Sequence, residues 1–131
     1  MPRPALMALV AAALSAASLP AQSAPDIRGI WEGPYQSEMV PPGSLKLSIA
    51  RSATGAWEVT LEIFAEQPPP AGPVRDFKQE GDKLSWVQDV AEMSCVSTAT
   101  VAGSVLKGSA ECWQNGAVVV TASFLLEKRK P

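Results

Sequence analysis

Hydrophobic and polar residues alternate along most of this chain, and turn residues interrupt the alternation every eight to twelve positions. Residues 57–64 show the pattern most clearly, because hydrophobic side chains from Trp57 to Ile63 occupy every second position and Glu or Thr lies between them. Successive side chains of a β-strand point to opposite faces, so this alternation predicts strands with one buried and one exposed face. The regular spacing of the turns predicts a sandwich or a barrel. The chain is therefore expected to be all-β.

Eight strands are expected from this pattern. They are residues 27–35, 44–51, 57–64, 74–79, 83–90, 93–102, 105–113 and 117–127. Glycine-containing turns at 52–55, 81–82 and 103–104 are short, whereas the connections 36–43 and 65–73 are long and rich in proline. Alternate loops of an up-and-down meander emerge at the same end, so the two long loops are expected to share one rim. Closing the sheet removes its exposed edges. The expected fold is an eight-stranded antiparallel up-and-down β-barrel.

Residues 1–23 are expected to be a cleaved signal peptide. Arg3 gives a charged start, an apolar run follows, and Ala21-Gln22-Ser23 has the small-x-small pattern of a cleavage site. Cleavage after Ser23 fits best and cleavage after Ala21 is the alternative; a buried N-terminal helix is the competing interpretation of the same segment. The apolar run is too short to span a bilayer, and no cysteine lies directly after the cleavage site, so no membrane anchor is expected. Residues 24–131 are then one exported domain, periplasmic or secreted.

The two cysteines, Cys95 and Cys112, are expected to form a disulfide, because an exported chain meets an oxidising compartment. If Gly103 and Ser104 form a two-residue turn, Cys95 lies eight residues before the turn and Cys112 eight residues after it. The two cysteines then face each other at a non-hydrogen-bonded pair, where side chains of neighbouring strands approach most closely. This separation suits a disulfide.

The same register places several small residues on the inward face of these two strands. They are Ser97, Ala99, Gly108 and Ala110, and Val101 and Leu106 complete the face. Small side chains leave space inside a barrel. Either a large ring such as that of Trp31 fills this space, or a cavity remains, and dense packing of protein cores favours filling.

Much of the chemistry of enzymes is missing from this sequence. The chain has no histidine, which excludes Ser-His-Asp and Cys-His catalysis and the commonest zinc ligand. Glu38 and Glu66 in the long loops are interpreted as solvated surface residues and not as a catalytic carboxylate pair. Loss of Arg3 with the signal peptide changes the net charge from −2 to −3, and the other charges are scattered, so nucleic acid is not an expected partner. We expect no catalytic activity, no metal and no cofactor.

The first expected strand carries Gly29-Ile30-Trp31. A Gly-x-Trp at the start of a meander barrel resembles the calycin superfamily, which includes lipocalins, fatty-acid-binding proteins and avidins. The resemblance implies that Gly29 and Trp31 are structural, that Trp31 closes one end of the barrel, and that a basic residue after the last strand, Arg129 or Lys128, packs over it. The chain lacks the Thr-Asp-Arg motif of lipocalins, the helical lid of fatty-acid-binding proteins and a recognisable avidin site, so biotin is not expected. It is most similar to the small calycin-type domains of secreted bacterial proteins.

Two functions follow from this fold. The first is binding of a small apolar ligand at the barrel mouth. Its expected lining is Tyr35, Met39, Val40, Phe64, Trp86 and Phe124. The alternative is a protein-binding module, such as a secreted protease inhibitor, that contacts a protein partner through the rim loops or the exported N-terminal segment. An open apolar cavity favours the first function, whereas a filled barrel with an exposed apolar patch near Met39, Val40 and Pro68-Pro69-Pro70 favours the second.

Overall fold

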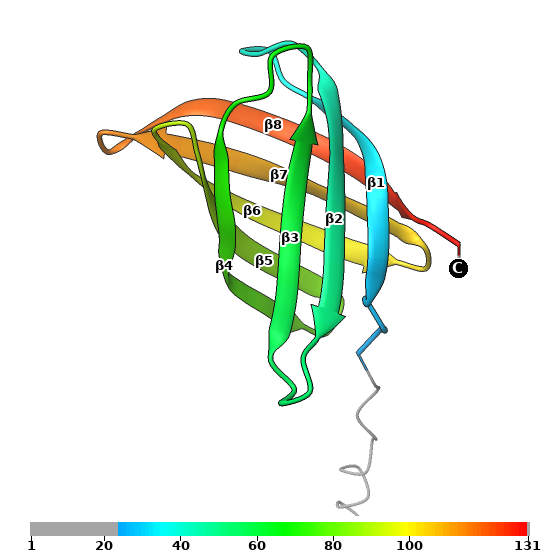
Figure 1. Ribbon diagram of the computed structural model, residues 1–131. Coiled ribbons are helices and arrows are strands. Elements are labelled where there is room, and N and C mark those ends of the chain that lie inside the picture. The colour runs from blue at the N-terminus through cyan, green and yellow to red at the C-terminus, as the bar shows by residue number, and fades with distance from the viewer. Residues whose placement is uncertain (1–23, 131) are drawn as a thin grey trace, which may run out of the picture.

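A computed structural model describes residues 24–130, and within them the protein is an eight-stranded antiparallel barrel that is nearly closed (Figure 1). The strands are β1 (Gly29–Gln36), β2 (Gly43–Arg51), β3 (Trp57–Phe64), β4 (Ala71–Glu80), β5 (Lys83–Val90), β6 (Met93–Ala102), β7 (Val105–Gln114) and β8 (Ala117–Lys128). The all-β fold class and the up-and-down order predicted from the sequence are confirmed. The predicted signal peptide, residues 1–23, lies outside the described residues.

Most strand bounds agree closely with the sequence pattern, and β1 and β4 differ most. β1 begins at Gly29 and not at Ile27, because Gly29 is the first residue that pairs with β2 and residues 24–28 belong to no strand. β4 is longer than its predicted range, 74–79, and is interrupted by register shifts on both sides of Val74 and Arg75. It contains Pro73, which has no N–H to donate, and Asp76 in a left-handed conformation with φ 56°. Proline and bulges are tolerated in an edge strand, which is the position of β4.

The barrel has one seam that backbone hydrogen bonds do not close. Strand order is β3-β2-β1-β8-β7-β6-β5-β4, so β1 pairs with β8 and the two ends of the sheet are β3 and β4. These two strands lie side by side in Figure 1, although no strand ladder joins them. The long segment from 65 to 70 connects them at the rim. We call the boundary between β3 and β4 the seam.

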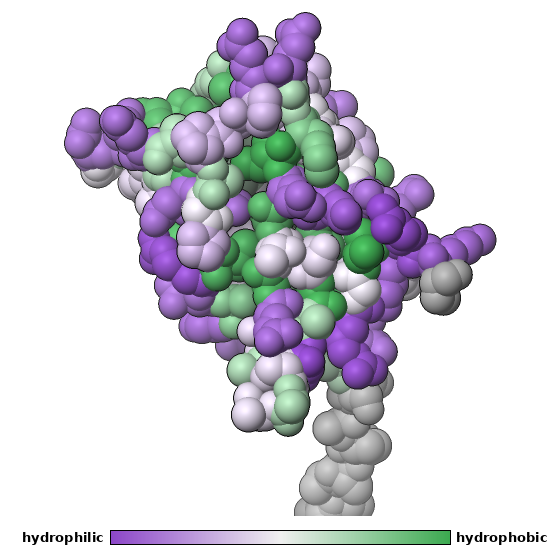
Figure 2. Space-filling model, viewed as in Figure 1, coloured by the Kyte–Doolittle hydropathy of each residue, from purple (hydrophilic) through white to green (hydrophobic). Residues whose placement is uncertain are grey.

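Side chains close the seam instead. Trp57 of β3 and Phe77 of β4 meet edge to face, with ring centroids 5.4 Å apart. Gln88 of β5 is buried and donates from Nε2 to the carbonyl oxygen of Leu61 in β3 and to that of Gly72 in β4, over 3.2 and 2.8 Å. One buried amide thus replaces part of the missing backbone ladder. The hydrophobic interior reaches the surface along the seam in Figure 2, which is viewed from this side.

The disulfide and its register agree with the sequence prediction. Cys95 and Cys112 are directly paired across β6 and β7 and are bonded, with their Cα atoms 3.9 Å apart. Gly103 opens the connecting turn with φ 62°, the conformation that a Gly-first hairpin turn needs. Both cysteines are buried together with Val90, and Met93 and Val120 pack against them. The disulfide therefore lies in the barrel wall near the rim that carries the β5–β6 and β7–β8 turns.

The end of the barrel opposite the long loops is closed by the segment before β1. Ile27 is buried and its carbonyl oxygen accepts a hydrogen bond from Trp31 Nε1 over 2.9 Å. The segment continues towards β4, where Gln79 Nε2 donates to the carbonyl oxygen of Pro25. Trp31 is fully buried in the core cluster. Ile27 and Trp31 together close this end.

Lys128, and not Arg129, packs over Trp31. The Lys128 ammonium lies 5.5 Å from the centroid of the Trp31 ring and donates to the carbonyl oxygen of Asp26. Arg129 instead forms an ion pair with Glu32, with Nη2 and Oε2 2.8 Å apart. The alternation of side chains explains why Lys128 contacts Trp31 and Arg129 does not. Lys128 lies two residues after Leu126, on the inward side of β8, and Arg129 falls on the outward side.

The hydrophobic core fills the part of the barrel next to the closed end. Besides Ile27 and Trp31 it contains Leu45, Leu47, Ile49, Leu84, Trp86, Ala99, Val101, Leu106, Phe124 and Leu126. Phe124 packs against Gly108, where a built Cβ atom would lie 2.7 Å from Phe124 Cζ. The space beside the small residues of β6 and β7 is therefore partly filled, by Phe124 where Trp31 was expected. Residues 24–130 contain no helix long and apolar enough to cross a membrane.

Candidate functional site

A cavity of about 370 Å³ remains between the packed core and the rim that carries the long loops. Every strand except β4 contributes to its wall, and the loops from 37 to 42 and from 65 to 70 reach its edge. The lining consists of Tyr35, Val40, Pro41, Leu45, Leu61, Ile63, Ala65, Glu66, Gln67, Pro69, Trp86, Gln88, Val90, Met93, Cys95, Ser97, Ala110, Cys112, Val120, Ala122 and Phe124. The sequence left two alternatives, a filled interior and a remaining cavity. The structure shows both: the interior is filled next to the closed end, and a cavity remains near the rim.

The wall of the cavity is mainly apolar. Leu61, Ile63 and Val120 lie on inward positions of their strands and are not fully covered by protein. Ala110 and Ala122 are paired across β7 and β8, and their short side chains leave the space that a larger residue would occupy. The hollow and its green hydrophobic lining are visible below the long loops in Figure 2. An apolar wall with a few polar groups is what small-molecule sites have in common.

Two aromatic rings mark the boundary between the cavity and the core. Trp86 and Phe124 are buried members of the core and also line the cavity. Their ring centroids are 6.0 Å apart and the rings are tilted by 37°. Phe77 stacks on Trp86 at 6.1 Å, which extends the aromatic contacts to the seam. The position of the boundary therefore depends on three rings that pack on one another.

Few polar groups enter the cavity. Gln88 and Ser97 are the buried polar residues of residues 24–130, and both are in the lining. The N–H groups of Gln88 are engaged with backbone carbonyl groups at the seam. Tyr35, Glu66 and Gln67 belong to the part of the wall near the long loops. Glu66 is the only charged residue among those that the structure places in the lining.

Four of the six expected lining residues are in the cavity wall, and two are not. Tyr35, Val40, Trp86 and Phe124 line the cavity. Phe64 is 49% exposed because it continues the alternation of β3 on the outward side, after the inward Ile63. Met39 is 56% exposed and lies over the outside of β8, where its Sδ accepts a hydrogen bond from the Thr121 amide over 3.3 Å.

Sequence reasoning missed Gln88 as a site residue, although a signal was present. Gln88 follows Leu84 and Trp86 at the spacing of inward positions, and a polar residue on an inward face calls for an explanation. Ser97 and Ala110 were placed on the inward face by the register but were not assigned to the site. The loop residues Pro41 and Pro69 had no signal, because their contact with the cavity depends on how the long loops fold over the rim.

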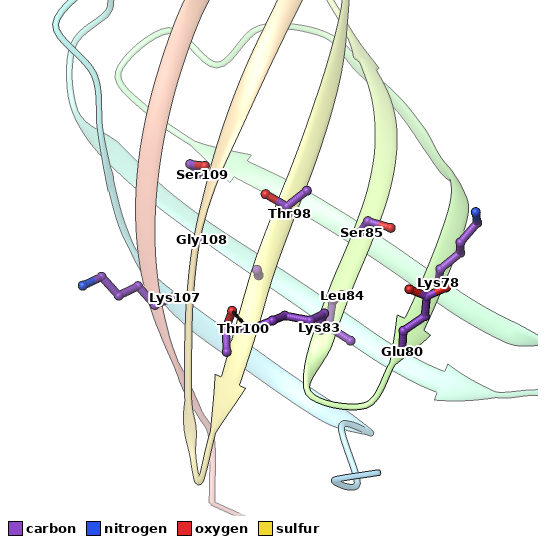
Figure 3. Close-up of a pocket in the computed structure, with 11 residues that line it drawn as sticks. Lys78, Glu80, Lys83, Leu84, Ser85, Thr98, Thr100, Lys107, Gly108 and Ser109 are labelled. Atoms are coloured by element: carbon purple, nitrogen blue, oxygen red, sulfur yellow. Dashed lines mark hydrogen bonds between the residues drawn. The ribbon is translucent and has the colours of Figure 1, made fainter.

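A second depression lies on the outside of the barrel, over β4 to β7 (Figure 3). Ser85, Thr98 and Ser109 form one row across three strands, and Lys83, Thr100 and Lys107 form the next. Lys78 and Glu80 of β4 border it. Lys83 Nζ donates to Thr100 Oγ1 over 3.2 Å, so part of this surface satisfies its own polar groups. No group of three or more His, Cys, Asp or Glu residues within 24–130 is arranged to hold a metal ion.

The one strongly shifted carboxyl group within residues 24–130 is that of Asp26, which is not in the cavity lining. Hydrogen bonds from the Arg28 guanidinium and amide hold the pKa of Asp26 well below its ordinary value of 3.8. Both side chains are exposed and sit in the segment at the closed end. This pair belongs to the structure of the N-terminal segment and has no contact with the candidate site.

Comparison with known proteins finds no match: no family model, no curated protein and no solved structure is similar to this chain.

Proposed function

We propose that the protein binds a small apolar molecule in the cavity at the barrel mouth and that it acts as a binding protein without catalysing a reaction. The cavity carries this proposal. Its volume of about 370 Å³ lies within the range of small-molecule sites, roughly 300–1,000 Å³, and its wall is mainly apolar. Tyr35 and Glu66 are the titratable groups of the lining apart from the bonded cysteines, and the chain has no histidine to pair with either of them.

We also propose that the protein is exported, and this agrees with a role in ligand binding. The Cys95–Cys112 disulfide is typical of an oxidising compartment, which agrees with a periplasmic or secreted protein released from a signal peptide at residues 1–23. A carrier or sensor outside the cytoplasm would meet its ligand there. The Gly29-Ile30-Trp31 resemblance to calycins points in the same direction, since Trp31 lies at the closed end of a meander barrel and a lysine packs over it.

The alternative, a protein-binding module, has less support. Met39 and Val40 are exposed at the rim, which such a module would use. However, a filled barrel was the observation expected for that role, and the barrel contains an open apolar cavity. Val40 also contributes to the cavity wall, so its position is accounted for by ligand binding.

Titration with the neutral fluorophore N-phenyl-1-naphthylamine tests the proposal. We expect a saturable rise in fluorescence with wild-type protein. Ala122→Phe, which places a ring in the cavity, is expected to abolish the rise, and Ser123→Phe is the matched control because Ser123 lies next to it on the exposed outer face. Thermal unfolding of both variants checks that they fold. No saturable binding to wild-type protein, or equal binding to both variants, would contradict the proposal.

Native mass spectrometry of protein purified from its own host adds a test that needs no chosen probe. A bound mass that is absent from Ala122→Phe would identify the natural ligand. Consistent absence of a co-purifying small molecule, together with no fluorophore binding, would favour the protein-binding alternative.

A further inference from the structure

One buried hydrogen-bond donor in the cavity wall has no acceptor. Trp86 is 1% exposed, and its Nε1 is the one buried side-chain N or O atom of residues 24–130 that forms no hydrogen bond. A buried donor left without a partner costs free energy, so such groups call for an explanation. The other buried indole, that of Trp31, donates to the carbonyl oxygen of Ile27 over 2.9 Å. Trp86 differs from Trp31 in that it lines the cavity.

The charge of the lining gives an independent indication. No lysine or arginine of residues 24–130 lines the cavity, and the single charged residue of the lining is Glu66. Lys46, which follows the lining residue Leu45 in the sequence, pairs with Glu62 on the outer face, and Arg75 pairs with Asp89. A carboxylate moved into an apolar cavity without a cationic partner pays a large desolvation cost. At the mouth it would meet the negative charge of Glu66.

From these two observations we propose that the ligand is an uncharged, mainly apolar molecule that carries a hydrogen-bond acceptor, such as a ketone or ester oxygen, and that it is not a free carboxylic acid. The inference rests on the proposed function, because it specifies the ligand of the same cavity. The acceptor oxygen would take the hydrogen bond from Trp86 Nε1. That nitrogen is covered by protein atoms, so the indole or its neighbours must shift slightly when the ligand binds.

The size of the cavity limits the ligand further. A volume of about 370 Å³ corresponds to roughly a dozen water molecules at ~30 Å³ each. A phenyl ring with a short alkyl chain fits this volume, whereas a long-chain lipid does not fit within the barrel. The rings of Trp86 and Phe124 at the inner boundary of the cavity offer aromatic or alkyl groups a surface to pack on.

Three probes of eleven carbon atoms separate these properties: valerophenone, pentylbenzene and 5-phenylpentanoate. Each displaces N-phenyl-1-naphthylamine if it binds the cavity. At pH 7.5 we expect valerophenone to bind most tightly, pentylbenzene about threefold or more weaker, and 5-phenylpentanoate at least about tenfold weaker than the ketone. If none of the three binds, the proposed function fails. If they bind with equal affinity, or the acid binds most tightly, only this inference is overturned.

Two variants and one spectrum locate the interactions. Glu66→Lys, at an exposed rim position, is expected to raise the ratio of the affinity for 5-phenylpentanoate to that for valerophenone severalfold, because only the acid carries a charge. Trp86→Phe is expected to lower the affinity for valerophenone more than that for pentylbenzene, because both ligands lose the same packing surface and only the ketone loses a hydrogen bond. If Trp86→Phe does not fold, the indole N–H resonances of 15N-labelled wild-type protein give the answer. Valerophenone should shift one of them downfield and pentylbenzene should not; the absence of such a shift would overturn the assignment of Trp86 as the donor.

Discussion

Gln88 donates a hydrogen bond from Nε2 to the carbonyl oxygen of Leu61 over 3.2 Å, across the seam at which the barrel lacks a backbone ladder. The same nitrogen donates to Gly72 on the other side of the seam. A side chain of β5 thus holds two edge strands together from inside the barrel. Because the amide lines the cavity as well, the closure of the seam and the shape of the candidate site depend on one residue.

Replacement of Gln88 by leucine should weaken the seam while keeping the volume of the side chain. The carbonyl groups of Leu61 and Gly72 lose their donor, and we expect a loss of about 1–3 kcal/mol in the free energy of unfolding. Hydrogen exchange should speed up most in β3 and β4, because those strands have one paired neighbour each. Urea unfolding and amide exchange measure both effects. Gln36→Leu, at an exposed position in β1, is the control; equal effects of the two substitutions would show that Gln88 does not hold the seam.

Gly29 makes the approach of Lys128 to the closed end possible. Its φ is 134°, and a Cβ atom built there would lie 2.9 Å from Lys128 Cε. Gly29→Ala should cost about 1–3 kcal/mol, from backbone strain and from the displacement of Lys128. In a Lys128→Ala background the cost should fall, because only the strain remains. Thermal and urea unfolding of the four proteins give the coupling between the two positions.

Gly81→Ala provides the comparison for Gly29. Gly81 has φ 63° in the β4–β5 turn, and no atom lies within 4 Å of a built Cβ. It should therefore show the conformational cost alone, about 1–2 kcal/mol, whether or not Lys128 is present. Additive effects of Gly29→Ala and Lys128→Ala would show that the lysine does not constrain position 29.

The disulfide should contribute about 3 kcal/mol to the free energy of unfolding, as expected for a loop of this length. The two cysteines are 17 positions apart in the sequence. Cys95→Ser/Cys112→Ser should lower the midpoint of thermal unfolding, and dithiothreitol should lower that of the wild type by a similar amount. The double variant itself should not respond to dithiothreitol. A stability equal to that of the oxidised wild type would contradict this account.

The fold could be read from the sequence because each of its main determinants is local. The alternation from Trp57 to Ile63 fixes which side chains of β3 point inward, and the Gly103-Ser104 turn fixes the pairing of Cys95 with Cys112. Neither depends on distant parts of the chain. Phe64 could have been excluded from the site by the same alternation, since it falls on the outward side.

Other features could not be read because they depend on how distant segments meet. The seam between β3 and β4 arises where the sheet fails to close, and no local pattern marks Gln88 as the residue that bridges it. The choice of Lys128 over Arg129 depends on the last residues of β8 relative to Trp31. The volume of the cavity depends on how far Phe124 reaches towards Gly108. Packing decides these features, and packing involves side chains from several strands at once.

Ala91 occupies a position that glycine should fill better. It opens the β5–β6 turn with φ 55°, a left-handed conformation in which a Cβ atom is strained by roughly 1–2 kcal/mol. Its amide donates to the carbonyl oxygen of Pro70 over 2.7 Å, which ties the turn to the start of β4, and a glycine amide can form the same bond.

Ala91→Gly should therefore raise the free energy of unfolding by up to about 1 kcal/mol, since the greater freedom of glycine in the unfolded chain offsets part of the relief. Ala102→Gly, within β6, should lower it by roughly 0.5–1 kcal/mol, because no left-handed residue is needed there. Urea unfolding of both variants checks the opposite signs, and a loss of stability in Ala91→Gly would show that the left-handed turn is not strained.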